Sequence, residues 1–66
     1  MRIQVNGESR EIEADLALTD LVASLNLKPE QIAIELNNEV VRRSAWSSIT
    51  VHDGDRIEIV HFVGGG

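Results

Sequence analysis

Hydrophobic and polar residues alternate along the first part of the chain. Residues 1–5 place Ile3 and Val5 on one side and polar side chains on the other, which is the pattern of a strand with one buried face. The pair Asn6-Gly7 follows, and it suits a type I′ turn because Asn tolerates a positive φ and Gly has no Cβ. Residues 8–13 alternate again, so the sequence predicts a β-hairpin at the amino end.

The next apolar positions have the spacing of a helix. They form one stripe at i, i+3, i+4 and i+7, made by Leu18, Leu21, Val22 and Leu25. The start of this helix is ambiguous, since Thr19 is chemically a good cap but a stripe that begins at Leu18 makes Ala17 the cap. Asn26 can adopt the left-handed conformation that ends helices, and Pro29 blocks continuation. We predict a helix over roughly residues 18–26.

The second half of the chain returns to strand patterns. Residues 32–36 alternate clearly, and Asn37-Asn38 is a plausible tight turn into a strand over 39–43. Residues 44–51 have no regular period and predict an irregular connection, while 56–60 form the last strand.

The order of these elements predicts an α+β domain. A single helix can cover one face of a sheet, so we expect a mixed sheet of four to five strands packed on one main helix. The first and last strands can pair in parallel in the middle of the sheet if the helix is the crossover. The opposite face lies in water unless a partner covers it. We expect residues 1–63 to form this domain and residues 64–66 to form a flexible glycine tail.

Composition narrows the possible functions. The 66 residues allow one domain, and 6 Lys+Arg against 11 Asp+Glu give a net charge of −5, so electrostatics provide no reason to bind nucleic acid or an anionic membrane. With no cysteine, the chain has no disulfide scaffold and no thiolate nucleophile. No apolar run approaches the ~18 residues of a membrane span, and the amino end has no signal-peptide layout, which indicates a cytoplasmic protein.

The sequence offers few side chains for catalysis. The two histidines, His52 and His61, belong to no metal-binding HExxH motif or catalytic triad, and no Gly-rich phosphate loop is visible. We expect His52 to be a solvated turn residue, because a structural zinc site needs about four ligands. His61 shares its side of the strand with Ile57 and Ile59, so we expect it to be partly buried, with a contact to a partner as the alternative. We expect no bound cofactor or metal.

Two further features have an ordinary and a functional interpretation. Trp46, the single tryptophan, is expected to anchor the long connection, with a partner contact as the alternative. Arg42-Arg43 is expected to be an exposed strand end, although arginine also forms geometrically specific pairs with the carboxylates of an acidic partner.

The carboxyl end is the most informative segment. Gly64, Gly65 and Gly66 follow an apolar strand directly, and each glycine loses much backbone entropy when it is ordered. A frayed terminus is one interpretation. The other is that the glycines, which have no side chains, enter a narrow channel of another protein. The four residues beyond Phe62 reach at most ~13–14 Å, a distance that would carry the terminal carboxylate from the domain surface into that protein's active site. Val60 and Phe62 lie on the side of the strand opposite the inward residues, so we expect them, with Val63, to form an exposed apolar docking surface.

Residues 53–66, with their Asp-Gly-Asp turn, Glu-Ile-Val-His run and glycine end, resemble the carboxyl end of the ThiS family, the sulfur carriers of thiazole (thiamine) biosynthesis. Residues 3–8, 19–22 and 35–41 resemble the same family, so the similarity covers essentially the whole chain. The resemblance implies the ubiquitin-like β-grasp fold, in agreement with the order of elements above.

The resemblance also implies a mechanism in which the chain is a carrier and not an enzyme. An E1-like adenylyltransferase of the ThiF type would adenylate the Gly66 carboxylate. A sulfur donor, such as a cysteine desulfurase or a persulfide protein, would convert it to a thiocarboxylate for a thiazole synthase of the ThiG type. Gly65 would keep the approach narrow and Gly64 would add reach. The alternatives are a molybdopterin-synthase small subunit, a ubiquitin-like modifier and an interaction domain whose tail has no chemical role.

Overall fold

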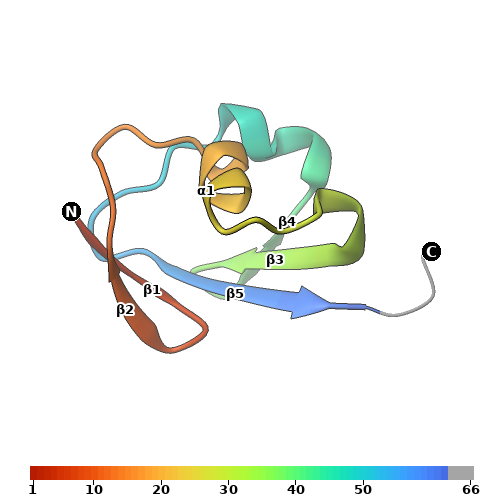
Figure 1. Cartoon of the computed structure of the whole chain (residues 1–66), viewed down its shortest axis with the longest axis horizontal. Coiled ribbons are helices and arrows are strands. Elements are labelled where there is room, and N and C mark those ends of the chain that lie inside the picture. The colour runs from red at the N-terminus through yellow and green to blue at the C-terminus, as the bar shows by residue number, and fades with distance from the viewer. Residues whose placement is uncertain (63–66) are drawn as a thin grey trace.

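The computed structural model describes residues 1–62 and contains one mixed sheet with a single α-helix (Figure 1). The regular elements are β1 (Arg2–Val5), β2 (Glu8–Glu11), α1 (Leu18–Ser24), β3 (Ile32–Leu36), β4 (Glu39–Val41) and β5 (Arg56–His61), with 3₁₀ turns η1 (Pro29–Gln31) and η2 (Arg43–Ser48). The five strands lie in the order β2-β1-β5-β3-β4. The predicted α+β architecture is confirmed.

The first and last strands are neighbours at the centre of the sheet. β1 and β5 run parallel, with Gln4 beside Arg56 and Val5 beside Ile57. β2 pairs with β1 on one side of these two strands, and the hairpin of β3 and β4 lies on the other side, where β3 pairs antiparallel with β5. The parallel pairing expected from a helical crossover is therefore present, and it places β5 between two other strands.

Both hairpin turns have the chemistry that the sequence indicated. Asn6 and Gly7 have φ angles of 51° and 82°, and Asn37 and Asn38 have φ angles of 51° and 71°. Two consecutive positive φ angles define a type I′ turn, whose twist matches that of the flanking strands.

Several element boundaries differ from the predicted ones. β2 ends at Glu11 rather than at residue 13, because Ile12 leaves the strand and packs against the core. β4 ends at Val41 rather than at residue 43, because the chain turns into η2. β5 continues one residue beyond the predicted end, to His61, which pairs with Ile32.

The start of α1 resolves the ambiguity between two possible caps. Ala17 is the N-cap and makes no side-chain capping bond. The backbone N–H of Leu18 instead donates to the carbonyl of Ile49 at 2.8 Å, so the connection before β5 supplies an acceptor. Thr19 therefore lies inside the helix, where its buried hydroxyl has no hydrogen-bond partner.

The end of α1 comes two residues before the predicted one. Asn26 has a φ of 58°, its N–H donates to Ala23 at 3.0 Å, and the N–H of Leu27 donates to Val22 at 3.3 Å. These two bonds form a Schellman motif, in which a left-handed residue stops the helix. Asn26 thus ends the helix as expected, but it lies outside the last helical turn.

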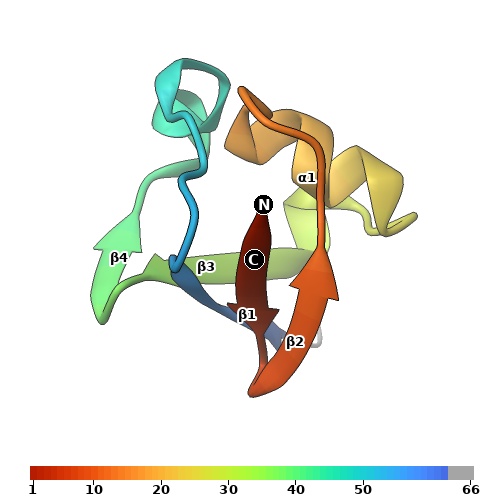
Figure 2. The ribbon, with the colours of Figure 1, turned by 90° about the vertical axis from the view of Figure 1, so that its left-hand side faces the viewer.

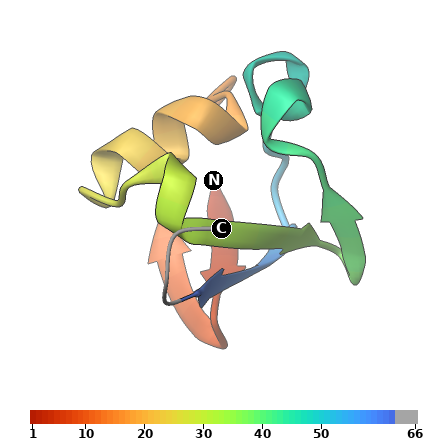
Figure 3. The ribbon, with the colours of Figure 1, turned by 90° about the vertical axis from the view of Figure 1, so that its right-hand side faces the viewer.

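The core lies between α1, η2 and one face of the sheet. Figures 2 and 3 show both helical segments on the same side of the strands. The buried side chains are Ile3, Val5, Leu18, Leu21, Val22, Ile32, Ile34, Trp46, Val51, Ile57 and Ile59. Among residues 1–62, no helix is long and apolar enough to cross a membrane. Within the same residues, no helix covers the other face of the sheet.

Trp46 anchors the connection between β4 and β5. Its side chain is 2% exposed, and its Nε1 donates to the carbonyl of Val41 at 3.1 Å. The predicted anchoring role is confirmed, and the alternative of a partner contact is wrong because the ring belongs to the core.

Candidate functional site

The carboxyl end of β5 is the candidate site. β5 runs toward one end of the long axis of the molecule, and the N-terminus lies at the other end (Figure 1). The N–H of Phe62 donates to the carbonyl of Gln31 at 3.1 Å, which holds the chain against the segment before β3. The domain boundary expected at residue 63 and the tail residues Gly64, Gly65 and Gly66 lie outside the described residues.

The apolar residues near this end have the exposure that the strand pattern predicted. Val60 is 55% exposed and Phe62 is 42% exposed, while Ile57 and Ile59 are buried on the other side of the strand. Large apolar side chains in contact with water at one place tend to mark an interface. The predicted docking surface consists of Val60, Phe62 and Val63, of which Val63 lies outside the described residues. Its role in docking stays a prediction.

Acidic and apolar side chains surround Val60 on the uncovered face. Ala33 lies opposite Val60 across the β3–β5 pair. One step along the sheet, Glu35 lies between Glu58 on β5 and Val40 on β4, and Val40 is 76% exposed. Like charges directly opposite each other are destabilising, so a basic group of a partner would be favourable here.

The structure corrects the expectation for His61. It is exposed and not partly buried, although it lies on the same side of β5 as the core residues. Burial on that side ends at Ile59, which is already 8% exposed, because the strand continues past the edge of the core. The solvated position expected for His52 is confirmed, since its side chain is 76% exposed and its Nδ1 lies 4.0 Å from an Asp55 oxygen.

Arg42-Arg43 and the acidic residues are the remaining candidates for a functional cluster in the described part of the chain. Arg42 and Arg43 are exposed as expected, but Arg43 begins η2 and is not the end of a strand. Among residues 1–62, no group of three His, Asp or Glu side chains is arranged to hold a metal ion.

Two asparagines hold β5 in place, which sequence reasoning missed. The backbone N–H of Asn6 donates to Ile57 at 2.9 Å, and its side chain both accepts from and donates to the backbone of Ile59, at 2.7 and 3.3 Å. Asn37 binds Arg56 at the other end of the strand, with its N–H donating at 2.7 Å and its Oδ1 accepting at 2.9 Å. No signal in the sequence indicated these bonds, because an Asn in a turn is expected to bind its own backbone two residues further on.

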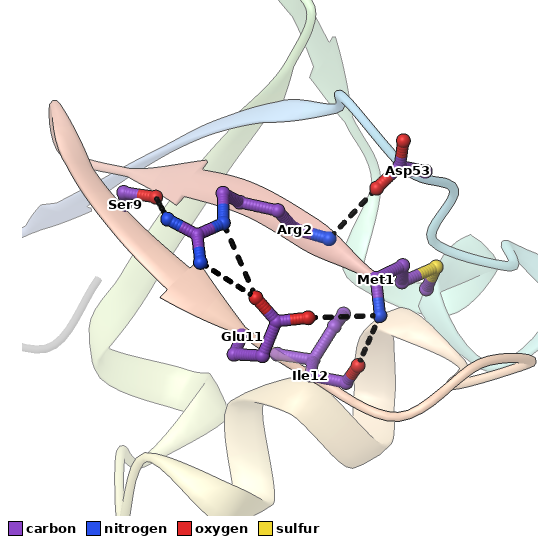
Figure 4. Close-up of polar contacts among 6 residues, drawn as sticks. All are labelled: Met1, Arg2, Ser9, Glu11, Ile12 and Asp53. Carbon is purple, nitrogen blue, oxygen red and sulfur yellow. Dashed lines mark hydrogen bonds and ion pairs between the residues drawn. The ribbon is translucent and has the colours of Figure 1, made fainter.

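A polar cluster at the N-terminus lies at the far end of the molecule from this site (Figure 4). The ammonium of Met1 donates to the carbonyl of Ile12 at 2.8 Å and lies 3.3 Å from the Glu11 carboxylate, which also pairs with Arg2 at 3.0 Å. The hydrogen bond from this ammonium and then the one from Arg2 lower the pKa of Glu11 below its usual value of 4.5. A shallow surface hollow of about 310 Å³ is lined by Arg2, Asp53, Arg56 and their neighbours. These contacts join β1, β2 and the loop before β5, so they serve the fold.

Comparison with known proteins shows the family to which the sequence and the structure of this chain are similar. The model of the ThiS family matches residues 3–66. The chain belongs to the ThiS family. Sulfur carrier protein ThiS of Bacillus subtilis is 37% identical over 65 residues, which are 97% of this chain and 98% of that protein. The crystal structure of the thiamine biosynthesis protein ThiS from Geobacter metallireducens superposes with a TM-score of 0.88 at 38% identity, with complete coverage of both chains. The ubiquitin-like β-grasp fold of the ThiS family is thereby confirmed.

A second group of relatives is longer. Thiazole synthase of Magnetococcus marinus is 41% identical to this ThiS-family chain over 66 residues, and thiazole synthase of Paramagnetospirillum magneticum is 38% identical over the same length. The chain spans a fifth of the length of each of these two proteins. A ThiS-like segment is therefore part of proteins that carry the name thiazole synthase.

Proposed function

We propose that this protein is a sulfur carrier for thiazole formation in thiamine biosynthesis and that Gly66 carries the sulfur as a C-terminal thiocarboxylate. Family membership over residues 3–66 supports the carrier role, as does the similarity to the sulfur carrier of Bacillus subtilis. The observation that carries the proposal is the position of β5, which leads to the glycine residues from one end of the molecule. The four residues after Phe62 can take a carboxylate at most ~13–14 Å beyond it.

The proposed chemistry takes place in partner enzymes. An ionised carboxylate is a poor electrophile, because negative charge is shared by both oxygens and no leaving group is present. In the active site of an E1-like adenylyltransferase, a Gly66 oxygen attacks the α-phosphorus of ATP, which forms an acyl adenylate and releases pyrophosphate. The terminal sulfur of a protein persulfide then attacks the carbonyl carbon and AMP leaves. A thiol cleaves the resulting acyl disulfide, which yields the thiocarboxylate and a new disulfide.

The acceptor of the sulfur in this proposal is a thiazole synthase. The two relatives named thiazole synthase support this partner, because each contains a segment similar to this chain. The adenylyltransferase and the sulfur donor, a cysteine desulfurase or a persulfide protein, are required by the chemistry. In every step Gly66 is a substrate, so the chain acts as a carrier and not as an enzyme.

We also propose that Val60, Phe62 and Val63 dock on the adenylyltransferase. The exposed fractions of Val60 and Phe62 support this proposal, as does their position next to the tail. The opposed carboxylates of Glu35 and Glu58 favour a partner surface that presents apolar side chains together with a basic group. Replacement of Phe62 by alanine should weaken binding to the adenylyltransferase. Unchanged binding would contradict this docking surface.

The carrier function is tested by reconstitution followed by measurement of the intact mass. The protein is incubated with the adenylyltransferase, ATP and a persulfide donor, and parallel reactions omit ATP or the donor. We expect a mass increase equal to the replacement of one oxygen by sulfur, located at Gly66 by fragmentation and absent from both controls. Conjugates between the carboxyl end and a lysine would indicate a ubiquitin-like modifier instead, and an unchanged mass would contradict the proposal.

A further inference from the structure

β5 extends further along the molecule than the strand beside it. The pairing of β1 with β5 ends at Val5 and Ile57, because the chain then turns back at Asn6. The side-chain amide of Asn6 then makes the contacts with β5 that the backbone of a further β1 residue would make. Its Oδ1 accepts a hydrogen bond from the N–H of Ile59 at 2.7 Å, and its Nδ2 donates to the carbonyl of the same residue at 3.3 Å. One side-chain amide thus continues the backbone pairing by one step.

Ile59 is the point where β5 leaves the core. It is the last buried residue of the strand, and the exposed residues Val60, His61 and Phe62 follow. On the β3 side, the bond from Phe62 to Gln31 holds this end. The ladder on that side also continues through Val60 and His61, which pair with Ala33 and Ile32. On the β1 side, the last contacts along the strand are those of Asn6 with Ile57 and Ile59. Among the described residues, the contacts that hold this end on the β1 side come from Asn6, so the course of the chain from Ile59 onward depends on that residue on this side.

The turn itself does not require this amide. A residue with a φ of 51° in a type I′ turn can be glycine, as Gly7 is in the same turn. What Asn adds to the turn is its side-chain contact with Ile59, which is 53 residues away in sequence. A bond between positions so far apart fixes the relative placement of the hairpin and the last strand.

We propose that Asn6 is a positioning residue for sulfur transfer. By holding Ile59, it fixes the direction of the last described residues of β5, and so it orients Val60 and Phe62 toward the adenylyltransferase. This inference rests on the proposed carrier function. Loss of the bond gives Val60–Phe62 more conformations, and the partner enzyme must then order them before the carboxylate can react.

Asn37 provides a matched control. It has the same φ of 51°, lies in the other hairpin turn, and holds the backbone N–H of Arg56 through its Oδ1 at 2.9 Å. Its Nδ2 donates to Asp55 at 3.0 Å. Replacement of Asn37 by glycine thus removes a bond of the same kind, from a side-chain oxygen to a backbone N–H of β5, at the end of the strand that is distant from the docking surface.

The experiment compares Asn6→Gly, Asn6→Asp and Asn37→Gly in the full chain. Amide hydrogen exchange is measured at His61 and Phe62, and ATP–pyrophosphate exchange is measured with the adenylyltransferase over a range of carrier concentrations. We expect Asn6→Gly to speed exchange at both amides and to lower kcat/KM about fivefold or more, which corresponds to about 1 kcal/mol for ordering one residue. Asn37→Gly should stay within about twofold of the wild type. Asn6→Asp keeps the acceptor for Ile59 and should react faster than Asn6→Gly.

The outcomes separate failure of the proposed carrier function from failure of the proposed role of Asn6. If the wild-type chain supports no pyrophosphate exchange, the carrier function is wrong and the role of Asn6 is wrong with it. If the wild type reacts and the two glycine variants have the same kcat/KM at a temperature where both are folded, the role of Asn6 alone is overturned. Unchanged amide exchange at His61 and Phe62 in Asn6→Gly would overturn it as well.

Discussion

The indole of Trp46 donates a hydrogen bond from Nε1 to the backbone carbonyl of Val41 at 3.1 Å. This bond joins η2 to the end of β4, and the ring itself is 2% exposed. The chain thereby closes one side of its core with a 3₁₀ turn instead of a second α-helix. In a chain of 66 residues, where the buried fraction of the surface is small, one large side chain contributes much of the available apolar burial.

Substitutions of Trp46 separate the apolar contribution of the ring from that of its hydrogen bond. Trp46→Ala should lower the free energy of unfolding by about 3–5 kcal/mol, because it removes a large buried side chain. Trp46→Phe fills part of the same space but leaves the Val41 carbonyl without its donor, so we expect a loss of about 1–3 kcal/mol. Urea denaturation followed by circular dichroism measures both, since the variants lack the tryptophan fluorescence. A Phe variant as stable as the wild type would show that the hydrogen bond contributes nothing.

The ion pairs of Glu11 predict a dependence of stability on pH. The N-terminal ammonium and Arg2 lower the pKa of Glu11 in the folded state, so its stabilising contribution is present above the usual value of 4.5. This contribution is lost as the pH falls through the lowered pKa, because the carboxylate then takes up a proton. Glu11→Gln should therefore lower stability near pH 7 and flatten the decrease in unfolding free energy between about pH 5 and pH 3.

A second glutamate provides the control for this pH experiment. Glu39 lies at the start of β4 and has no ion pair among residues 1–62. Glu39→Gln removes the same charge, so it should leave the shape of the pH curve close to that of the wild type. Unfolding midpoints in urea, measured at each pH for all three proteins, give the comparison. If the two variants have the same pH dependence, the Glu11 contacts do not stabilise the fold.

The sequence predicted the fold well because the signals that determine it are local. Alternation marked four of the five strands, and Asn6-Gly7 and Asn37-Asn38 marked the two hairpin turns, the second of which also predicted the strand β4 that follows it. The parallel pairing of β1 and β5 followed from a single helix between two hairpins. The resemblance identified the family, which the match over residues 3–66 confirms.

What the sequence could not provide depends on contacts between distant residues. Ala17 is a poor cap by composition, yet the helix begins there because the carbonyl of Ile49 accepts the N–H of Leu18. His61 has the strand position of a core residue, but the core ends before it. The bond of Asn6 to Ile59 joins the two ends of the chain, and nothing in the local sequence around either residue indicates it.

A substitution in the tail tests whether the carboxyl end must enter a narrow site. Gly65→Val adds a β-branched side chain, which widens the segment and restricts its backbone. We expect the fold to be unchanged by circular dichroism, and the rate of thiocarboxylate formation to fall on the order of 100-fold, since small misplacements of reacting atoms can cost that much. Gly64→Ala, outside the terminal Gly-Gly pair, should have a smaller effect. Normal thiocarboxylate formation by Gly65→Val would contradict the narrow approach.

The uncovered face contains two exposed valines that allow the docking surface to be located. Val60 lies next to the tail on β5, and Val40 lies on β4 at the edge of the sheet, where it is more exposed. Both point to the same side of the sheet, as the strand register shows, because Val40 lies opposite Glu35 and Val60 lies opposite Ala33. Replacement of either valine by serine removes the same apolar group from an exposed position. The two variants should therefore fold with similar stability.

Their binding to the adenylyltransferase should differ. Val60→Ser removes an apolar contact of the proposed docking surface, so we expect its Kd to rise about tenfold, the equivalent of about 1.4 kcal/mol. Val40→Ser should change the Kd less than about twofold, because residues at or beyond the rim of an interface contribute little. Calorimetric titration of each variant into the enzyme gives both values. Equal losses would place the contact across the whole sheet face, and a larger loss for Val40→Ser would move the docking surface away from the carboxyl end of β5.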